Sequence, residues 1–250
     1  TIPHSSTQRK LTRRSRRGRI TPLTFANPGD PAIEEVRGLR TTVQLALRRS
    51  RNNVIAIGGL APKAGKSFVS VNLAQLLAAA EGRVLLVDGD LRRGGLHRYF
   101  GLEPQPGVVE VVTGAATLDE ALRPTDTPHL DLLPAGRLPG NPAELLAGAP
   151  FEALLGELGR RYDVVLVDTP PILSVADSAL VGRHAGVNLL VLRAGEHSLG
   201  EILAALRRLV QNGVTIRGAV LNDVRPRWGR YGRTARYRRY ELVRRERDVH

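Results

Sequence analysis

Cysteine and methionine are both absent from this chain of 250 residues. Without cysteine the chain can form neither a disulfide framework nor a metal site with thiolate ligands, which fits a reducing compartment. No apolar run approaches the roughly 20 residues that a helix needs to cross a bilayer. Because a translated protein needs a start residue, a chain that opens at Thr1 without methionine is expected to be a fragment of a longer polypeptide.

Lysine is scarce as well, although arginine is abundant. After Lys10 the only lysines are Lys63 and Lys66, which lie close together behind a Gly-rich turn. A lysine ammonium is a compact point charge that suits phosphate, whereas arginine presents a planar fork. The position of the two lysines therefore indicates a phosphate-binding loop.

The residues around Lys66 have the strand–loop–helix order that such a loop requires. Residues 54–57 form a short apolar run typical of a buried strand, and residues 68–77 have apolar side chains at helical spacing. Gly65 would let backbone N–H groups approach phosphate oxygens at the helix N-terminus. Lys66 would reach the outer phosphates, and the Ser67 hydroxyl would bind Mg²⁺.

One position departs from the usual pattern of this loop. Leu60 stands where the first glycine is usual, and Gly58 and Gly59 come just before it. An ordinary Gly-rich turn before a helix is the alternative, but the Gly-Lys-Ser sequence at the strand-to-helix junction favours phosphate binding. The candidate nucleotide-binding residues of the loop are Pro62, Lys63, Ala64, Gly65, Lys66, Ser67 and Phe68.

Carboxylates follow two further apolar runs. Asp88 and Asp90 come directly after residues 83–87, and Asp168 follows residues 163–167. Open α/β sheets place their chemistry at the carboxyl ends of buried parallel strands, and buried carboxylates are costly unless a cation or metal accompanies them. An aspartate that ends a strand after a phosphate loop is expected to help hold Mg²⁺. For Asp168 a helix cap or turn is the alternative.

Strand and helix patterns alternate along the chain. The predicted strands are residues 54–57, 83–87, 130–133, 163–167, 188–192 and 216–221, and the predicted helices are residues 32–49, 68–77, 151–160, 175–184 and 199–211. This alternation predicts an α/β domain of P-loop NTPase type with a doubly wound, mostly parallel sheet. Asn222 ends the last strand, where its amide could read a nucleobase edge or occupy a turn.

The formal net charge of +13 is concentrated at the two ends of the chain. Residues 1–31 are basic and contain several prolines, and we expect them to be flexible. The arginine-rich run 225–247 carries Tyr231, Tyr237 and Tyr240. Such ends could bind nucleic acid, flank a membrane helix on its cytoplasmic side, or be solvated disordered tails with modified tyrosines.

The predicted helix over residues 32–49 begins after Asp30, a residue suited to cap it. Glu34, Arg37 and Arg40 follow one another at helical spacing and share one face of the helix. By itself this pattern is more typical of a solvated face than of an interface.

Together these motifs resemble one family. Residues 61–67 (APKAGKS), 85–93 (LLVDGDLRR) and 165–171 (VLVDTPP) are similar to the Walker A, A′ and B motifs of bacterial tyrosine kinases. The Glu-x-x-Arg-x-x-Arg helix and the tyrosine-bearing tail also match features of that family. The resemblance is to the cytoplasmic kinase domain of Wzc-like polysaccharide co-polymerases, whose full chains have two membrane helices and a periplasmic region.

The resemblance implies roles for individual residues. Lys66 and Ser67 would hold ATP phosphates and Mg²⁺, and Asp168 would coordinate Mg²⁺ directly or through water. Asp88 and Asp90 would serve the Mg²⁺ site and activate the attacking tyrosine hydroxyl, with Asp88 favoured as the base. Lys66, Asp88 and Asp90 are therefore the candidate catalytic residues, and Ser67, Asp88 and Asp168 the candidate metal ligands.

The resemblance also implies a domain organisation: a basic juxtamembrane linker over 1–31, a kinase domain over 32–223 and a flexible tail over 224–250. Asn222 would contact adenine. Some members carry a regulatory tyrosine shortly after the A′ motif, where this chain has Gly95, and this tail has fewer tyrosines than many.

At the level of the whole protein, the family implies a homo-oligomeric ring whose contact is the Glu-x-x-Arg-x-x-Arg helix and whose substrate is its own tail tyrosines. It would lie at the cytoplasmic face of the bacterial inner membrane, attached through segments upstream of Thr1. A cognate tyrosine phosphatase and polysaccharide export machinery would be partners, and no nucleic acid is expected. A P-loop ATPase switch of the MinD/ParA type without kinase activity is the main alternative, and a nucleic-acid-binding protein is another.

Overall fold

A seven-stranded sheet crosses the middle of the molecule, which is seen here in a computed structural model that describes residues 1–14 and 18–225. The strands are β1 Val54–Gly59, β2 Val84–Asp88, β3 Arg123–Pro124, β4 Leu130–Leu133, β5 Val164–Asp168, β6 Val187–Arg193 and β7 Gly218–Asn222. Their spatial order is β3-β4-β2-β5-β1-β6-β7, and only the pairing of β3 with β4 is antiparallel. The predicted doubly wound, mostly parallel sheet is confirmed.

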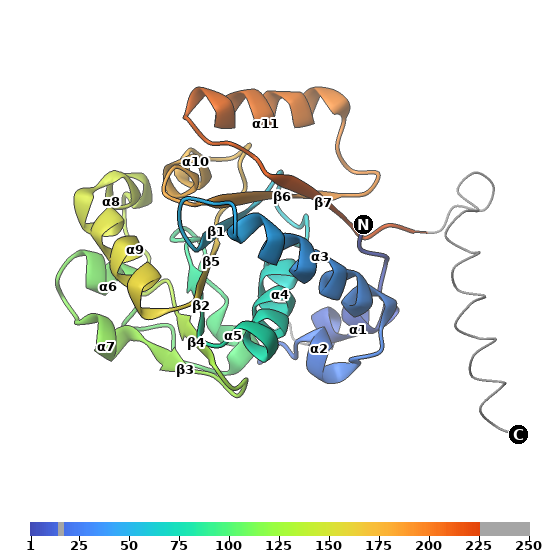
Figure 1. Ribbon diagram of the computed structural model, residues 1–250, viewed down its shortest axis with the longest axis horizontal. Helices are drawn as coiled ribbons and strands as arrows, with labels where there is room; N and C mark the ends of the chain where they lie inside the picture. Colours follow the sequence, from blue (N-terminus) through green and yellow to red (C-terminus); the bar gives the residue numbers. More distant parts are fainter. Residues whose placement is uncertain (15–17, 226–250) are drawn as a thin grey trace, which may run out of the picture.

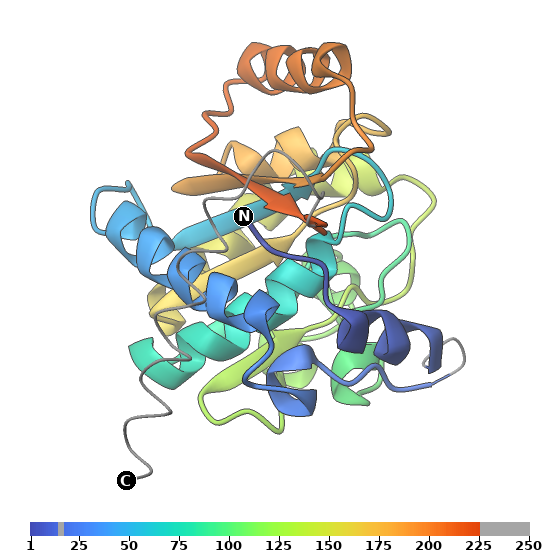
Figure 2. The ribbon, with the colours of Figure 1, turned by 90° about the vertical axis from the view of Figure 1, so that its right-hand side faces the viewer.

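The helices cover both faces of this sheet (Figure 1). They are α1 Ser6–Arg14, α2 Leu23–Ala26, α3 Pro31–Leu47, α4 Lys66–Glu81, α5 His97–Phe100, α6 Val108–Val112, α7 Leu118–Ala121, α8 Pro142–Ala147, α9 Ala149–Arg161, α10 Asp177–Gly182 and α11 Leu199–Gln211. α3 and α4 pack on one face, and α6, α8 and α9 on the other. Figure 2 shows α11 lying apart, on the β6–β7 side. It closes a smaller core there through Ala205 and Leu209.

The central strands are fully buried, which explains why their sequences are continuous apolar runs rather than alternating ones. In the register of the sheet Ile57 of β1 and Asp88 of β2 both lie opposite Asp168 of β5. Because these strands are parallel, the phosphate-binding loop and the motif aspartates come to the same edge of the sheet.

Most predicted elements occur where expected. α11 matches its predicted range, and α3 begins one residue earlier, at Pro31, with the Asp30 carboxylate accepting a hydrogen bond from the Ala32 backbone N–H at 2.9 Å. β7 begins two residues later than predicted, at Gly218. β3 was not predicted, because two residues carry no periodicity.

The N-terminal segment corrects the sequence prediction. Residues 1–31 were expected to be flexible, yet within their described part Ile2 and Leu23 are buried and α1 and α2 form. The Ile2 N–H donates to the Leu221 carbonyl at 2.8 Å, and the His4 N–H donates to the Val224 carbonyl at 2.9 Å. This backbone therefore adds a short parallel pairing beside β7. The prediction failed because it relied on the basic composition of the whole segment and not on single apolar residues such as Ile2 and Leu23.

The chain contains no membrane-spanning candidate in its described part, since none of the helices there is both long and apolar enough.

The packed N-terminal segment can be tested at two neighbouring positions of α2. Leu23 is fully buried, whereas the Phe25 side chain is 53% exposed. We expect Leu23→Ala to lower the free energy of unfolding in a urea titration by about 2–5 kcal/mol, because it leaves a cavity. Phe25→Ala is the matched control and should change it by less than about 0.5 kcal/mol. Equal small effects would mean that the segment does not contribute to the core.

Candidate active site

The loop between β1 and α4 has the backbone shape of a phosphate cradle. Gly65 precedes the first residue of α4 with φ of +90°, a left-handed conformation that glycine adopts without strain. A Cβ at this position would collide with the Asn222 side-chain amide. That amide donates a hydrogen bond to the Ala64 carbonyl at 3.0 Å. The end of β7 thus supports the loop just before the helix N-terminus, which is suited to bind an anion.

Asp168 lies at the centre of the candidate active site, at 2% exposure. One carboxylate oxygen accepts from Lys66 Nζ at 2.5 Å and from Ser67 Oγ at 2.9 Å. The other accepts from Ser70 Oγ at 2.7 Å. The cation and both hydroxyl groups come from the first turns of α4, so the predicted Walker A and Walker B residues meet.

Ser70 is a member of this cluster that sequence reasoning missed. It lies one helical turn after Ser67, so the two hydroxyl groups share a face of α4. The spacing of Ser67 and Ser70 could have indicated that both hydroxyl groups reach the same site. It was not used, because a serine within an apolar helix usually bonds to a carbonyl of the preceding turn. That acceptor is also near, since Ser70 Oγ lies 3.1 Å from the Lys66 carbonyl oxygen, but the Asp168 carboxylate at 2.7 Å is the shorter partner of its one hydroxyl proton.

Asp88 is buried on the neighbouring strand and tied to the loop that follows it. One carboxylate oxygen accepts the backbone N–H groups of Gly95 at 2.7 Å and Leu96 at 3.0 Å. Burial raises the pKa of Asp88 to about 6; the charge of Asp168 also raises it, while the backbone hydrogen bonds and Lys66 lower it. A pKa near neutrality is suitable for a general base.

Asp90 has a different setting. It is half-buried, and its carboxylate accepts the Arg93 backbone N–H at 3.2 Å, while its carbonyl accepts that of Gly94 at 2.8 Å. Asp90 therefore heads a tight turn and is more accessible than Asp88. Between the two lies Gly89, where a Cβ would come within 2.8 Å of Val167. The assignment of the base to Asp88 rather than Asp90 stays a prediction.

The donor set fits Mg²⁺. Ser67, Asp88 and Asp168 offer hard oxygen ligands at one edge of the sheet, and Asp88 pairs with Asp168 in the β2–β5 register. Among the described residues no cluster of three or more His, Cys, Asp or Glu side chains could enclose a metal alone. Mg²⁺ sites often use one or two carboxylates together with substrate phosphates, as this arrangement would require.

The remaining predicted residues are placed as follows. Pro62 and Lys63 are exposed at the tip of the loop. Glu34 and Arg37 of α3 form a salt bridge of 2.6 Å, whereas Arg40 Nη1 donates to the Leu76 carbonyl of α4 at 3.4 Å. The Arg40 side chain thus bonds to α4 of its own chain, whereas Glu34 and Arg37 bond to each other. Tyr231, Tyr237 and Tyr240 lie outside the described residues.

Fold and site together define a P-loop nucleotide-binding protein. A family model described as AAA domain matches residues 52–199. The chain is 41% identical over 225 residues to the tyrosine-protein kinase ptk of Acinetobacter johnsonii, covering 90% of this chain and 31% of that protein. It is also 41% identical to the tyrosine-protein kinase wzc of Salmonella typhimurium, covering 81% of this chain and 28% of that one.

Solved structures agree with these relatives. The BceF tyrosine kinase domain matches with a TM-score of 0.83 and 43% identity over 89% of this chain and 91% of that one. The kinase domain of Escherichia coli ETK matches with a TM-score of 0.84 and 40% identity over 91% and 90%. The chain belongs to the bacterial tyrosine-kinase family, and it spans about 30% of the length of the full-length relatives above.

A more distant structural neighbour carries a nucleotide. The Pyrococcus horikoshii septum site-determining protein MinD, complexed with Mg-ADP, matches with a TM-score of 0.58 and 25% identity over 71% of each chain. The predicted P-loop architecture is confirmed by this likeness, which supports nucleotide and Mg²⁺ binding.

The raised pKa of Asp88 predicts a pH-dependent contribution to stability. Its pKa is about 6 in the folded chain against an ordinary value of 3.8, so folding favours the protonated form. The wild type should therefore lose stability as pH rises through this window, by up to ~3 kcal/mol. Asp88→Asn cannot ionise and lacks this loss.

The measurement is urea unfolding of both proteins in EDTA between about pH 4 and pH 7.5, where the stability of the variant relative to wild type should rise with pH and level off above ~6.5. Any constant effect of the amide cancels in this comparison. A difference that stays flat, or falls with rising pH, would contradict the assignment.

Proposed function

We propose that this chain is an ATP-dependent protein-tyrosine kinase domain that phosphorylates the tyrosines of its own tail, between subunits of a ring. The observation that carries the proposal is the meeting of Lys66, Ser67 and Asp168 within hydrogen-bond distance, with Asp88 beside them on the next strand. This combination can neutralise transferred phosphate and supply a carboxylate base in one place. The kinase relatives support the same activity.

The tyrosines themselves support the tail as substrate. Of the chain's five tyrosines, Tyr99 and Tyr162 lie in the described part. Tyr162 is buried, and its hydroxyl donates to Asp131 at 2.8 Å. Tyr99 packs against the core, and burial raises its pKa to about 12. Neither hydroxyl is presented to an active site on another molecule, which leaves the three tail tyrosines.

In the proposed reaction a tyrosine oxygen bonds to the γ-phosphorus of ATP as the bond from that phosphorus to the bridging oxygen of ADP breaks. Bound Mg²⁺ would supply charge neutralisation at the phosphates. Lys66 adds positive charge at the same place, and Asp88 or Asp90 accepts the phenolic proton. Proximity and electrostatics, rather than covalent catalysis, provide the rate.

The setting that we propose for this activity is the cytoplasmic face of the bacterial inner membrane, where phosphorylation would regulate exopolysaccharide or capsule polymerisation and export. A tyrosine phosphatase would reverse the modification. Of the proposed contact helix, Glu34 is the exposed member, with 71% of its side chain accessible, so it is the residue that a neighbouring arginine could reach. Asn222, which supports the loop, would also contact adenine.

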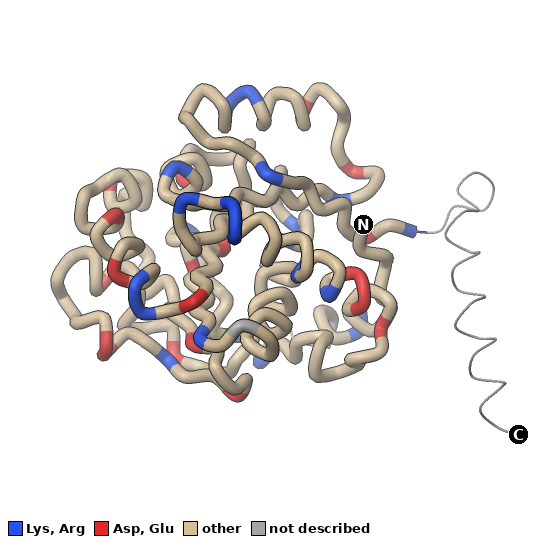
Figure 3. The backbone as a smooth tube through the Cα atoms, viewed as in Figure 1, with Lys and Arg blue, Asp and Glu red and all other residues tan. Residues whose placement is uncertain are grey.

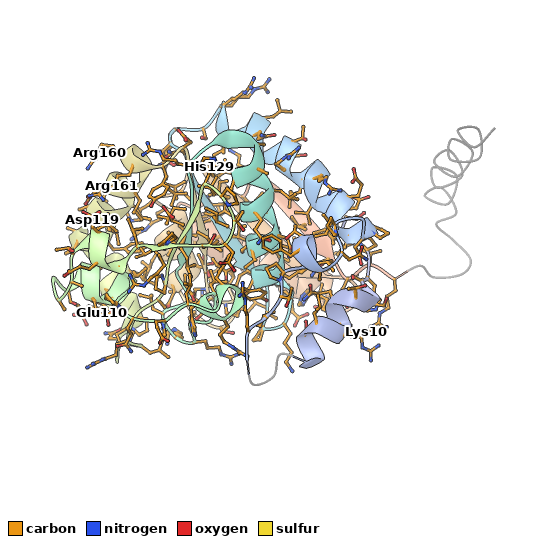
Figure 4. All side chains as sticks on the ribbon, turned by 90° about the horizontal axis from the view of Figure 1, so that it is seen from below. Lys10, Glu110, Asp119, His129, Arg160 and Arg161 are labelled. Atoms are coloured by element: carbon orange, nitrogen blue, oxygen red, sulfur yellow. The ribbon has the colours of Figure 1, made fainter. Side chains whose placement is uncertain are left out.

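The alternative is a P-loop ATPase switch, and Lys66→Met separates the two. We expect this variant to lose at least ~10²-fold in tyrosine phosphorylation, because it removes a phosphate ligand. It should be less stable than wild type but still folded, because it removes the cation paired with Asp168 while Ser67 and Ser70 continue to bond that carboxylate. The measurement is an anti-phosphotyrosine blot of protein incubated with ATP and Mg²⁺. Lys10→Met is the matched control, since Lys10 lies on α1 at the outer edge of the molecule (Figure 4). ATP hydrolysis without any phosphotyrosine in the wild type would favour the switch.

Transfer between subunits predicts the outcome of a mixing experiment. A Lys66→Met chain with an intact tail is combined with an active chain that lacks residues after Asp223. Phosphotyrosine is expected on the inactive chain, because oligomer contacts raise the local concentration of the tail at a neighbouring site. If the inactive chain stays unlabelled while wild type labels itself even at high dilution, transfer takes place within one chain.

A further inference from the structure

An ion pair joins the loop after β2 to the start of α10, through Arg92 of the A′ motif and an aspartate that the sequence analysis did not single out. Arg92 Nε donates to Asp177 Oδ2 at 2.8 Å, and Arg92 Nη2 donates to Asp177 Oδ1 at 3.0 Å. Asp177 is the first residue of α10 and is fully buried, whereas the Arg92 side chain is 40% exposed. Two parallel hydrogen bonds fix the position of an arginine more closely than one.

Arg92 belongs to the turn that Asp90 heads. That turn is closed by the backbone hydrogen bonds from Arg93 and Gly94 to the Asp90 carbonyl, at 3.2 and 2.8 Å. The charge of Asp90 also lies near the guanidinium, whose pKa is raised mainly by the hydrogen bonds to Asp177 and to a smaller degree by Asp90. Holding Arg92 therefore holds the turn and the carboxylate at its start.

Ser178, the residue after Asp177, contacts the loop that follows β5. Ser178 Oγ lies 3.0 Å from Thr169 Oγ1 and also donates to the Pro170 carbonyl. Thr169 directly follows Asp168, and its hydroxyl donates to the Ile57 carbonyl of β1 at 3.1 Å. The start of α10 thus contacts the loop after β2 through Asp177 and the loop after β5 through Ser178.

We propose that the Arg92–Asp177 pair is a positioning unit of the kinase reaction, which holds Asp90 at its working distance from Asp168. This inference rests on the proposed function. Asp168 is already fixed by the α4 cluster. The turn that carries Asp90 is held by the buried side chain of Leu91 and by the Asp90 N–H, which donates to Asp88 Oδ1 at 3.3 Å, and Arg92 adds an ion pair from this turn to α10. A misplacement of about 1 Å at a reacting group can lower a rate by ~10²-fold.

Two conservative variants test the pair. Arg92→Lys keeps the positive charge but loses the two-pronged hydrogen bond, and Asp177→Asn keeps the shape but loses the charge. For each variant and the double variant we would measure kcat and KM for ATP in tail phosphorylation, the Mg²⁺ concentration for half-maximal rate, and the Kd of a fluorescent ADP analogue in EDTA. Melting temperature is recorded beside them.

We expect kcat to fall at least ~10-fold and the half-maximal Mg²⁺ concentration to rise several-fold, with the Kd in EDTA unchanged within about twofold, because the phosphate loop is not touched. The double variant should be no worse than the worse single variant, since both changes break one interaction. A merely structural pair would lower the melting temperature and leave kcat and the Mg²⁺ requirement unchanged.

A second arginine–aspartate pair provides the matched control. Arg161 Nη1 donates to Asp119 Oδ1 at 2.5 Å, and both residues lie at the α7–α9 side of the molecule (Figure 4). Arg161→Lys and Asp119→Asn should leave every kinetic value unchanged.

Several results would overturn the inference: unchanged kcat in folded Arg92→Lys, losses that add in the double variant, or equal losses in the control pair. If Asp177→Asn does not fold, Arg92→Lys decides alone. If wild type makes no phosphotyrosine, the proposed function fails, and the pair is then judged by the Mg²⁺ dependence of ATP hydrolysis.

Discussion

Placing an ionised carboxylate in a protein interior costs several kcal/mol unless a cation and hydrogen-bond donors surround it. Asp168 meets this requirement with Lys66, Ser67 and Ser70, which all come from the beginning of α4. The end of β5 and the start of α4 therefore cannot move independently. Since α4 follows the phosphate-binding loop directly, the same interaction fixes the loop against the central strands.

The other side of the loop depends on β7. Asn222 bonds to the Ala64 carbonyl, and the next residue, Asp223, accepts two hydrogen bonds from Arg193 and contacts His4 at 2.5 Å. Residues 2–4 pair with the backbone of residues 221–224 at this point. The segment that looked like a linker in sequence is thus in contact with the strand that supports the nucleotide loop. Charged residues of both signs are spread over the body of the molecule (Figure 3). These contacts therefore depend on individual hydrogen bonds and ion pairs.

Sequence patterns gave the sheet, the phosphate loop and its carboxylates, because each depends on local periodicity or on a glycine with a defined conformation. Apart from the two-residue strand β3, the features that sequence patterns missed depend on partners distant in sequence. Ile2 is buried through pairing with β7, and Ser70 joins the active-site cluster through the Asp168 carboxylate. Asp177 pairs with Arg92, 85 residues earlier in the chain. A single sequence shows which residues can make such contacts but not which of them meet.

The electrostatics of the site explain why a nucleotide with a divalent cation suits it. Asp88 and Asp168 lie opposite each other on adjacent strands, and the charge of Asp168 disfavours the ionised form of Asp88. Lys66 is bonded to Asp168 and only partly offsets the charge at Asp88, whose pKa stays raised. A divalent cation placed between these oxygens would relieve that repulsion, and the phosphates that accompany it would meet the positive end of α4. The burial that raises the pKa of Asp88 would thus favour both proton uptake by this carboxylate and a metal ion beside it.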